Sequence, residues 1–177
     1  MVIMNIFLTG EIQVGKSTII NKFLDSHKNL KVGGFRTISN FDENLGVIGG
    51  VYIVSTLDEN PIFTEDNHVG DRGEIKKGYP DKFDSKGVEF LSNLNDCDLI
   101  LMDEIGFMES QAKDFSKAIL NILDKDIPVI GVVKPKNKGL PLEVKNHPKT
   151  KLLTITEENR NDSYLEFERL LEDELNY

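Results

Sequence analysis

The segment Gly10-Glu11-Ile12-Gln13-Val14-Gly15-Lys16-Ser17 constrains the fold of this chain more than any other feature. It matches the pattern G-x-x-x-x-G-K-[ST], follows an apolar run at residues 3–9, and precedes a helical period at residues 16–26. A strand, a glycine-rich loop and a helix in this order are typical of a phosphate-binding P-loop. The sequence therefore predicts an α/β fold whose first strand leads into a site for a nucleoside triphosphate.

Each part of this loop has a chemical role. Glycines let the backbone wrap closely around phosphate, while successive N–H groups and the following helix N-terminus supply partial positive charge. Lys16 adds a full positive charge, Ser17 is expected to place its hydroxyl on Mg²⁺, and Thr18 is expected beside the α-phosphate. We therefore predict that residues 10–18 bind the nucleotide, with Ser17 also a metal ligand.

A second acidic segment completes the predicted site. Residues 98–104 read Asp-Leu-Ile-Leu-Met-Asp-Glu, four apolar residues followed by two carboxylates, as in a Walker B strand. Asp103 is expected to hold Mg²⁺ through water, because this hard cation prefers oxygen ligands and keeps much of its hydration. Glu104 is expected to polarise the water that attacks the γ-phosphate, so Lys16 and Glu104 are the predicted catalytic residues.

Apolar runs alternate with helical periods along the chain. Runs typical of strands occur at residues 3–9, 47–56, 98–103, 127–133 and 151–155, with a weaker one at 32–38. Helical periods occur at residues 16–26, 85–95, 111–124 and 162–175, and Phe107, Phe115 and Ile119 are expected in the core. The alternation predicts a mostly parallel sheet with helices on both faces in a single domain, residues 1–177. Residues 57–84 show no sustained period and are predicted to be a loop-rich excursion over the sheet edge.

Charge and cysteine content narrow the partners and the compartment. The formal net charge is −9, so a stable complex with nucleic acid is not expected. Cys97 is the only cysteine and cannot form an intramolecular disulfide, which favours a reducing, cytoplasmic location. The apolar start at residues 1–8 is too short to span a membrane, and no membrane partner is expected. Oligomeric state is left open.

Three motifs resemble those of a known family. Asp103-Glu104-Ile105-Gly106 followed by Met108-Glu109 is similar to the D-E-I-G-x-M-E signature of the small cancer-related nucleoside-triphosphatase family, which also occurs in thermophilic microbes. Gly34-Phe35-Arg36-Thr37 and Thr156-Glu157-Glu158-Asn159-Arg160 resemble two further motifs of that family, in the same order. The resemblance implies a RecA-like, three-layer P-loop fold and slow, Mg²⁺-dependent hydrolysis of nucleoside triphosphates with broad base tolerance. It also places Glu109 at a second acidic position, although a glutamate that begins a helix is an equal interpretation.

The chain departs from the family pattern at the arginines. Where the family has arginines after its G-F-x-T motif, this chain has Ile38, Ser39, Phe41 and Val47, and its P-loop has Ile12-Gln13 in place of a small pair. An arginine that stabilises the γ-phosphate contributes about 10³ to 10⁵ in rate. Candidate substitutes are Arg36, Arg72 and Arg160, of which Arg160 is favoured because it lies in a matching motif. Asn159 and Arg160 are also predicted to bind near the nucleobase.

Two other functions stay open from the sequence. A small-molecule or nucleotide kinase uses the same loop and metal, and Asp71-Arg72 with Lys76-Lys77 is a candidate lid or acceptor site. A nucleotide-binding adaptor with vestigial hydrolysis fits the missing arginines. A regulatory GTPase would need an N-K-x-D segment, and residues 137–140 read Asn-Lys-Gly-Leu, which is more simply a loop.

Overall fold

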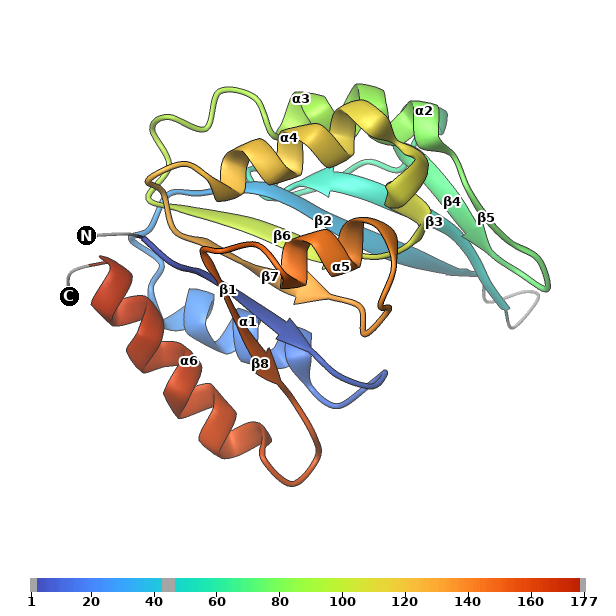
Figure 1. Cartoon of the computed structure of the whole chain (residues 1–177). Coiled ribbons are helices and arrows are strands. Elements are labelled where there is room, and N and C mark those ends of the chain that lie inside the picture. Colours follow the sequence, from blue (N-terminus) through green and yellow to red (C-terminus); the bar gives the residue numbers. More distant parts are fainter. Residues whose placement is uncertain (1–2, 43–46, 176–177) are drawn as a thin grey trace.

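The strands of the protein join in a single sheet. The structure, a computed structural model, describes residues 3–42 and 47–175. Its strands are β1 (Asn5–Thr9), β2 (Val32–Asp42), β3 (Val47–Ser55), β4 (His68–Arg72), β5 (Lys76–Gly78), β6 (Leu99–Ile105), β7 (Val129–Val133) and β8 (Thr150–Thr154). The eight strands lie in the order β5-β4-β3-β2-β6-β7-β1-β8 (Figure 1). β2, β6, β7, β1 and β8 run parallel, whereas β3, β4 and β5 continue the sheet as antiparallel strands.

Helices cover both faces of this sheet. They are α1 (Lys16–Ser26), η1 (Glu65–Asn67), α2 (Pro80–Lys82), η2 (Phe83–Gly87), α3 (Val88–Phe90), η3 (Met108–Gln111), α4 (Lys113–Leu123), α5 (Gly139–Lys145) and α6 (Arg160–Leu175). α1 and α6 cover one face, and α3 and α4 lie over the other (Figure 1). Within β1, Ile6 and Leu8 pack with Phe23 of α1, whereas Phe7 packs on the opposite side with Phe115 of α4. Burial on both faces explains why the parallel strands are nearly continuous apolar runs.

The strand order sets the geometry of the predicted site. β7 lies between β1, which leads into the P-loop, and β6, which ends at the acidic pair. This separation is the RecA-like arrangement, so the predicted fold class is confirmed. All six predicted strands are present, and α1 spans the predicted residues 16–26.

Three segments differ from the predictions. Residues 57–84 are not only loop, because β4 and β5 lie within them and widen the sheet. The helix predicted at residues 85–95 is displaced, since α2, η2 and α3 run from Pro80 to Phe90 and Asn93 adopts a positive φ of 56°. The segment 137–140, expected to be a loop, contains the start of α5 at Gly139.

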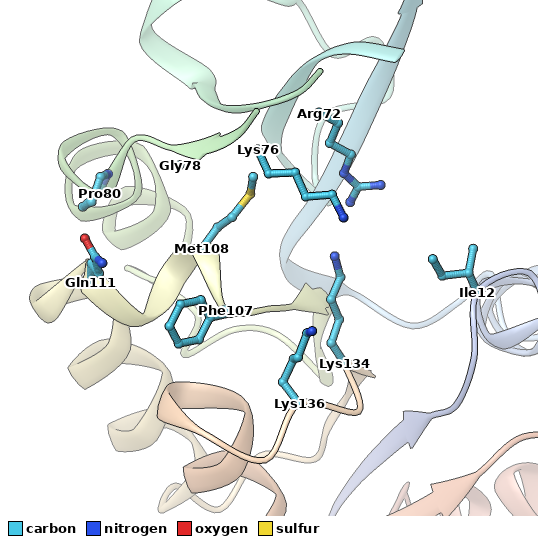
Figure 2. A pocket seen from close by; sticks show the side chains of 10 residues that line it. All are labelled: Ile12, Arg72, Lys76, Gly78, Pro80, Phe107, Met108, Gln111, Lys134 and Lys136. Carbon is cyan, nitrogen blue, oxygen red and sulfur yellow. The ribbon is translucent and has the colours of Figure 1, made fainter. Parts of the chain in front are cut away.

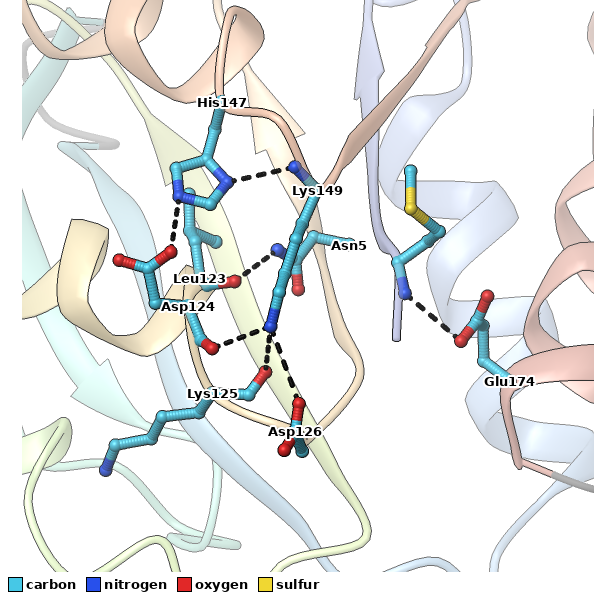
Figure 3. A network of polar contacts seen from close by, with 9 residues as sticks. Asn5, Leu123, Asp124, Lys125, Asp126, His147, Lys149 and Glu174 are labelled. Carbon is cyan, nitrogen blue, oxygen red and sulfur yellow. Dashed lines mark hydrogen bonds and ion pairs between the residues drawn. The ribbon is translucent and has the colours of Figure 1, made fainter. Parts of the chain in front are cut away.

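A network of polar contacts lies at the amino ends of the parallel strands (Figure 3). The Asn5 side-chain amide donates to the Leu123 carbonyl at 2.9 Å, and the Lys149 ammonium donates to the Asp124 carbonyl at 2.7 Å. His147 Nε2 lies 3.3 Å from the Asp124 carboxylate. These contacts join the end of α4 to the starts of β1 and β8. The amino ends of the strands are thus braced, and the candidate site lies at their carboxyl ends.

Candidate functional site

The P-loop backbone requires glycine at two positions. Gly10 and Gly15 have φ angles of +144° and +100°, and a Cβ on Gly10 would lie 2.3 Å from the carbonyl oxygen of Ile155. The Ile155 amide also donates to the Thr9 carbonyl at 2.8 Å, so the end of β8 presses against the start of the loop. Gln13, where the family resemblance predicts a small residue, has a φ of 64°, a conformation that glycine adopts most readily.

Lys16 lies against its own loop and faces the acidic pair. Its ammonium donates to the Gly10 carbonyl at 2.8 Å and to the Glu11 carbonyl. Burial lowers the pKa of Lys16, and the negative charges of Glu104, Glu11 and Asp103 oppose that shift. Lys16 is therefore within electrostatic reach of both carboxylates on β6. Ser17 and Thr18 follow it in the exposed first turn of α1.

Asp103 is a largely buried carboxylate. Its side chain is 12% exposed and lies 3.8 Å from the Arg36 guanidinium on the neighbouring strand β2. Residues 36 and 103 are direct partners in the parallel register of β2 and β6. Burial raises the pKa of Asp103 to about 6, with Arg36 and Lys16 opposing and Glu104 adding to the shift. Arg36, from the G-F-x-T-like motif, thus partners the predicted metal ligand.

Glu104 is held between two cations. Its Oε1 atom lies 3.2 Å from the Arg72 guanidinium of β4 and 3.1 Å from the Lys134 ammonium. Its backbone N–H donates to the Thr37 hydroxyl at 3.3 Å. Lys134, directly after β7, was not predicted as a site residue. Its position past the carboxyl end of a parallel strand is the only sequence signal that pointed to it.

Glu109 is buried and bonds to the backbone after β6. Its carboxylate accepts a hydrogen bond from the Gly106 N–H at 3.0 Å, and the residue is 5% exposed. Burial raises the pKa of Glu109 to about 7. It lies in the first turn of η3, so it does begin a helix, but it faces inward and fixes the Gly106 turn.

Asn159 and Arg160 lie beyond β8, and they differ in their surroundings. The Asn159 amide accepts from the Thr156 N–H at 2.8 Å and donates to the Thr154 carbonyl at 2.9 Å. Arg160 lies beside the P-loop, because a Cβ on Gly15 would be 3.8 Å from Arg160 Cδ. Arg160 was the favoured substitute for the missing arginines, yet the arginines that contact the acidic pair are Arg36 and Arg72.

A pocket of about 440 Å³ opens beside this site (Figure 2). It is lined by Ile12, Arg72, Lys76, Gly78, Pro80, Phe107, Met108, Gln111, Lys134 and Lys136. Phe107 was expected in the core with Phe115 and Ile119, but it is 40% exposed at this pocket. Met108 packs on β4 and β5, since a Cβ on Gly70 or Gly78 would lie 3.3 or 3.1 Å from it.

Every helix within the described residues, 3–42 and 47–175, is too short or too polar to span a membrane. Over the same part of the chain, no group of three or more His, Cys, Asp or Glu side chains is placed to hold a metal ion by itself.

Comparisons with known proteins agree with this geometry. A sequence model of the NTPase family matches residues 5–167. Nucleoside-triphosphatase THEP1 of Methanocaldococcus jannaschii is 36% identical, over 98% of this chain and 96% of the relative. The solution structure of a human cancer-related nucleoside triphosphatase superposes with a TM-score of 0.71 at 25% identity, covering 96% of this chain and 98% of that one. The crystal structure of THEP1 from Aquifex aeolicus, 24% identical, has the same fold, with a TM-score of 0.73 and coverage of 96% and 99%.

The resemblance inferred from the three sequence motifs is thus confirmed by independent comparisons. The matched segment contains the P-loop, the acidic pair on β6 and the Asn159-Arg160 turn. The sequence match, the strand order and the shared fold lead to one conclusion: the chain belongs to the NTPase family.

Proposed function

We propose that this protein hydrolyses nucleoside 5′-triphosphates, such as ATP and GTP, to diphosphates and phosphate, slowly and with broad tolerance of the base. The observation that carries the proposal is the position of Glu104, a carboxylate at the end of β6 that Arg72 and Lys134 hold at 3.2 and 3.1 Å. The name of the M. jannaschii relative, a nucleoside-triphosphatase, supports the same reaction. We further propose that residues 1–177 act as one cytoplasmic domain.

Magnesium is the proposed cofactor, and the donor set suits it. Ser17 offers a hydroxyl in the exposed first turn of α1, and Asp103 offers a carboxylate at the end of β6. Mg²⁺ commonly binds through one or two protein oxygens plus substrate phosphates and water, so no larger cluster of protein ligands is needed. When bound, Mg²⁺ would neutralise charge on the β- and γ-phosphates.

Glu104 is the proposed proton acceptor. A water oxygen forms a bond to the γ-phosphorus, the bond from that phosphorus to the bridging oxygen of the diphosphate breaks, and the water proton passes to the Glu104 carboxylate. Negative charge grows on the γ-phosphoryl oxygens during this step, and cations positioned beforehand stabilise it. Lys16, Arg72 and Lys134 are the proposed cations, so Arg72 and Lys134 supply positive charge that the missing family arginines would otherwise provide.

The remaining P-loop residues are proposed to cradle the phosphates. Residues 10–18 offer backbone N–H groups and a helix N-terminus, the groups that bind phosphate in such loops. Arg160, beside Gly15, is proposed to lie near the bound nucleoside. Asn159 is proposed to shape the same turn through its hydrogen bonds to residues 154 and 156.

Phosphate release from ATP, GTP, CTP and UTP, with Mg²⁺ or with a chelator, tests the proposal. Glu104→Gln keeps the size of the side chain but removes the proton acceptor, and we expect release to fall about 100-fold. Glu166→Gln, an exposed change on α6, is the matched control and should release phosphate at the wild-type rate. Equal rates in the two variants would remove Glu104 from the mechanism.

Measuring diphosphate beside free phosphate separates the two alternatives. Diphosphate that forms without free phosphate, and only when a small acceptor is added, would indicate a kinase, because the γ-phosphoryl group then passes to an oxygen of the acceptor instead of to water. Tight nucleotide binding with no release under any condition would indicate an adaptor. The cations beside Glu104 favour hydrolysis over the adaptor, since a vestigial site has no need to balance that carboxylate.

A further inference from the structure

The pocket beside Glu104 contains more positive charge than the acidic pair requires. Arg72 and Lys134 already pair with Glu104, but Lys76 and Lys136 form no ion pair with any described residue. None of the ten described residues that line the pocket is acidic. In a chain with a net charge of −9, such a cluster of cations creates a local field that attracts anions.

The pocket also offers apolar surface. Phe107, Met108 and Pro80 lie on one side of it, and Ile12 of the P-loop lies on the other (Figure 2). Ile12 is 87% exposed and Phe107 is 40% exposed, so both present apolar surface to a ligand in the pocket. Sites for small molecules combine apolar walls with a few polar groups that fix orientation. This pocket has both elements.

The pocket is distinct from the phosphate cradle. Of the P-loop residues, Ile12 alone lines it among those described, while Lys16 and Ser17 do not. Its walls come instead from β4, β5, the start of α2, Phe107 with η3, and the segment after β7. Figure 2 shows Arg72, Lys76 and Lys134 directing their charged groups into one space. A ligand in that space would lie next to Glu104, on the side of the antiparallel strands.

We propose that this pocket binds a second ligand, a small organic anion with a phosphate or carboxylate group on an apolar body, while a nucleoside triphosphate occupies the P-loop. Its anionic group contacts Lys76 and Lys136, and its body packs on Phe107. Because the anion also attracts Arg72 and Lys134, it competes with Glu104 for them, and occupancy of the pocket changes the hydrolysis rate. Only that last step rests on the proposed function.

Binding of 1-naphthyl phosphate, measured by calorimetry, tests the proposal without any turnover. The full chain is first saturated with Mg²⁺ and a non-hydrolysable ATP analogue, so that the P-loop is occupied. Charge reversal in Lys76→Glu/Lys136→Glu should weaken binding at least about tenfold. Lys77→Glu, the adjacent position on β5, is outside the pocket lining and is the matched control, expected to change affinity less than about twofold.

Further probes separate charge from apolar contact. 1-Naphthol, which is neutral, should bind at least about tenfold more weakly than 1-naphthyl phosphate. Comparison of 1-naphthyl phosphate with 1-naphthoate shows whether the site prefers phosphate or carboxylate. Phe107→Ala should weaken both anions about tenfold and leave the affinity for inorganic phosphate unchanged. The milder Lys76→Gln/Lys136→Gln pair, with an unfolding curve for each variant, covers the case in which charge reversal disturbs folding.

Three results would overturn the proposal. The first is equal affinity for 1-naphthyl phosphate in the wild type and in Lys76→Glu/Lys136→Glu. The second is equal affinity of the wild type for 1-naphthol and 1-naphthyl phosphate. The third is loss of probe binding when the ATP analogue is present, which would place the probe in the nucleotide site. A protein that binds the probe as proposed but releases no phosphate would refute the hydrolysis proposal alone.

Discussion

The parallel strands and the antiparallel extension contribute to the site in different ways. β1 and β6 end in groups that are contiguous in the sequence, the P-loop and the pair Asp103-Glu104. The extension, β3 to β5, contributes Arg72 and Lys76, which the sequence offers only as candidates because neither lies in a motif with a defined chemical role. Sequence motifs therefore predict which groups bind phosphate and metal, whereas the cations that balance Glu104 depend on how distant strands pair.

The two regions also differ in how they are held. β1 and β7 are buried at every residue, while β5 is exposed at two of its three. The extension is fastened by the pairing of β3 with β2 and by Met108, which packs on Gly70 and Gly78. η3, which contains Met108 and Glu109, therefore joins the two regions.

The largest effect is expected in the parallel region. Lys16→Ala removes the one full positive charge of the P-loop, and we expect kcat/KM for ATP to fall about 1000-fold, or about 4 kcal/mol. Lys28→Ala, an exposed lysine after α1, is the control. Steady-state phosphate release measures both. A Lys16→Ala enzyme within twofold of the control would mean that this region does not determine the rate.

The next effect tests whether the extension takes part in the chemistry. Arg72→Ala removes one of the two cations that contact Glu104, and we expect a fall of about 100-fold in kcat/KM, or about 3 kcal/mol. Lys77→Ala, on the adjoining strand of the extension, should change it less than about twofold. Equal kcat/KM values for Arg72→Ala and Lys77→Ala would mean that the extension has a structural role only and takes no part in the chemistry.

The stability of the protein is expected to depend on pH through Glu109, which lies at the junction of the two regions. Its pKa is about 7 in the folded chain against an ordinary value of 4.5, so the folded state binds the proton more tightly. The stability from this group is therefore full below about pH 4.5, declines as pH rises, and is lost above about pH 7. Relative to Glu109→Gln, the free energy of unfolding of the wild type should fall by about 2 kcal/mol from pH 5 to pH 8.

Urea unfolding at pH 5, 6, 7 and 8 measures this difference. Glu109→Gln retains an oxygen that can accept from the Gly106 N–H, so only the titration is removed. Glu166→Gln, on exposed α6, should follow the wild type at each pH. A difference in the free energy of unfolding between the wild type and Glu109→Gln that stays constant with pH would show that Glu109 does not titrate in this range.

The smallest effect concerns the attachment of the extension. A Cβ on Gly78 would lie 3.1 Å from Met108 Cβ, so Gly78→Ala should destabilise the protein by about 1 kcal/mol. Gly73→Ala, in the same hairpin, places its Cβ in open space and is the control. Hydrogen exchange should speed up in β4 and β5 and not in β1. Uniform acceleration across the sheet would mean that the two regions unfold together.

The sequence was sufficient where a pattern is long or chemically specific. α1 is amphipathic over eleven residues behind a glycine-rich loop, and its bounds were predicted correctly. β4 and β5 were missed because they are short, and because glycines that appear to signal turns, Gly70 and Gly78, are there to accommodate Met108. α5 was missed because its seven residues include a proline and lie among loop residues.

The site was predictable to the same extent. Lys16 belongs to the P-loop pattern, and Asp103 and Glu104 belong to the Walker B pattern, each of which predicts a chemical role. The structure brings the three residues within electrostatic reach of one another. Lys134 and Arg72 reach Glu104 only because β7 lies beside β6 and because β4 continues the sheet beyond β2 and β3. Strand order is a property of the whole chain, and no single segment encodes it.

The exposed edge strand β5 has a consequence for the solubility of the protein. An edge strand presents unpaired backbone groups that can recruit a strand from another molecule, and short length and lysine side chains discourage this. β5 has three residues, and two of them are Lys76 and Lys77. The lysine proposed to attract a ligand therefore also protects the protein from aggregation. Apolar substitutions at both positions would expose a template for intermolecular β-pairing. Aggregation therefore limits how hydrophobic β5 can become.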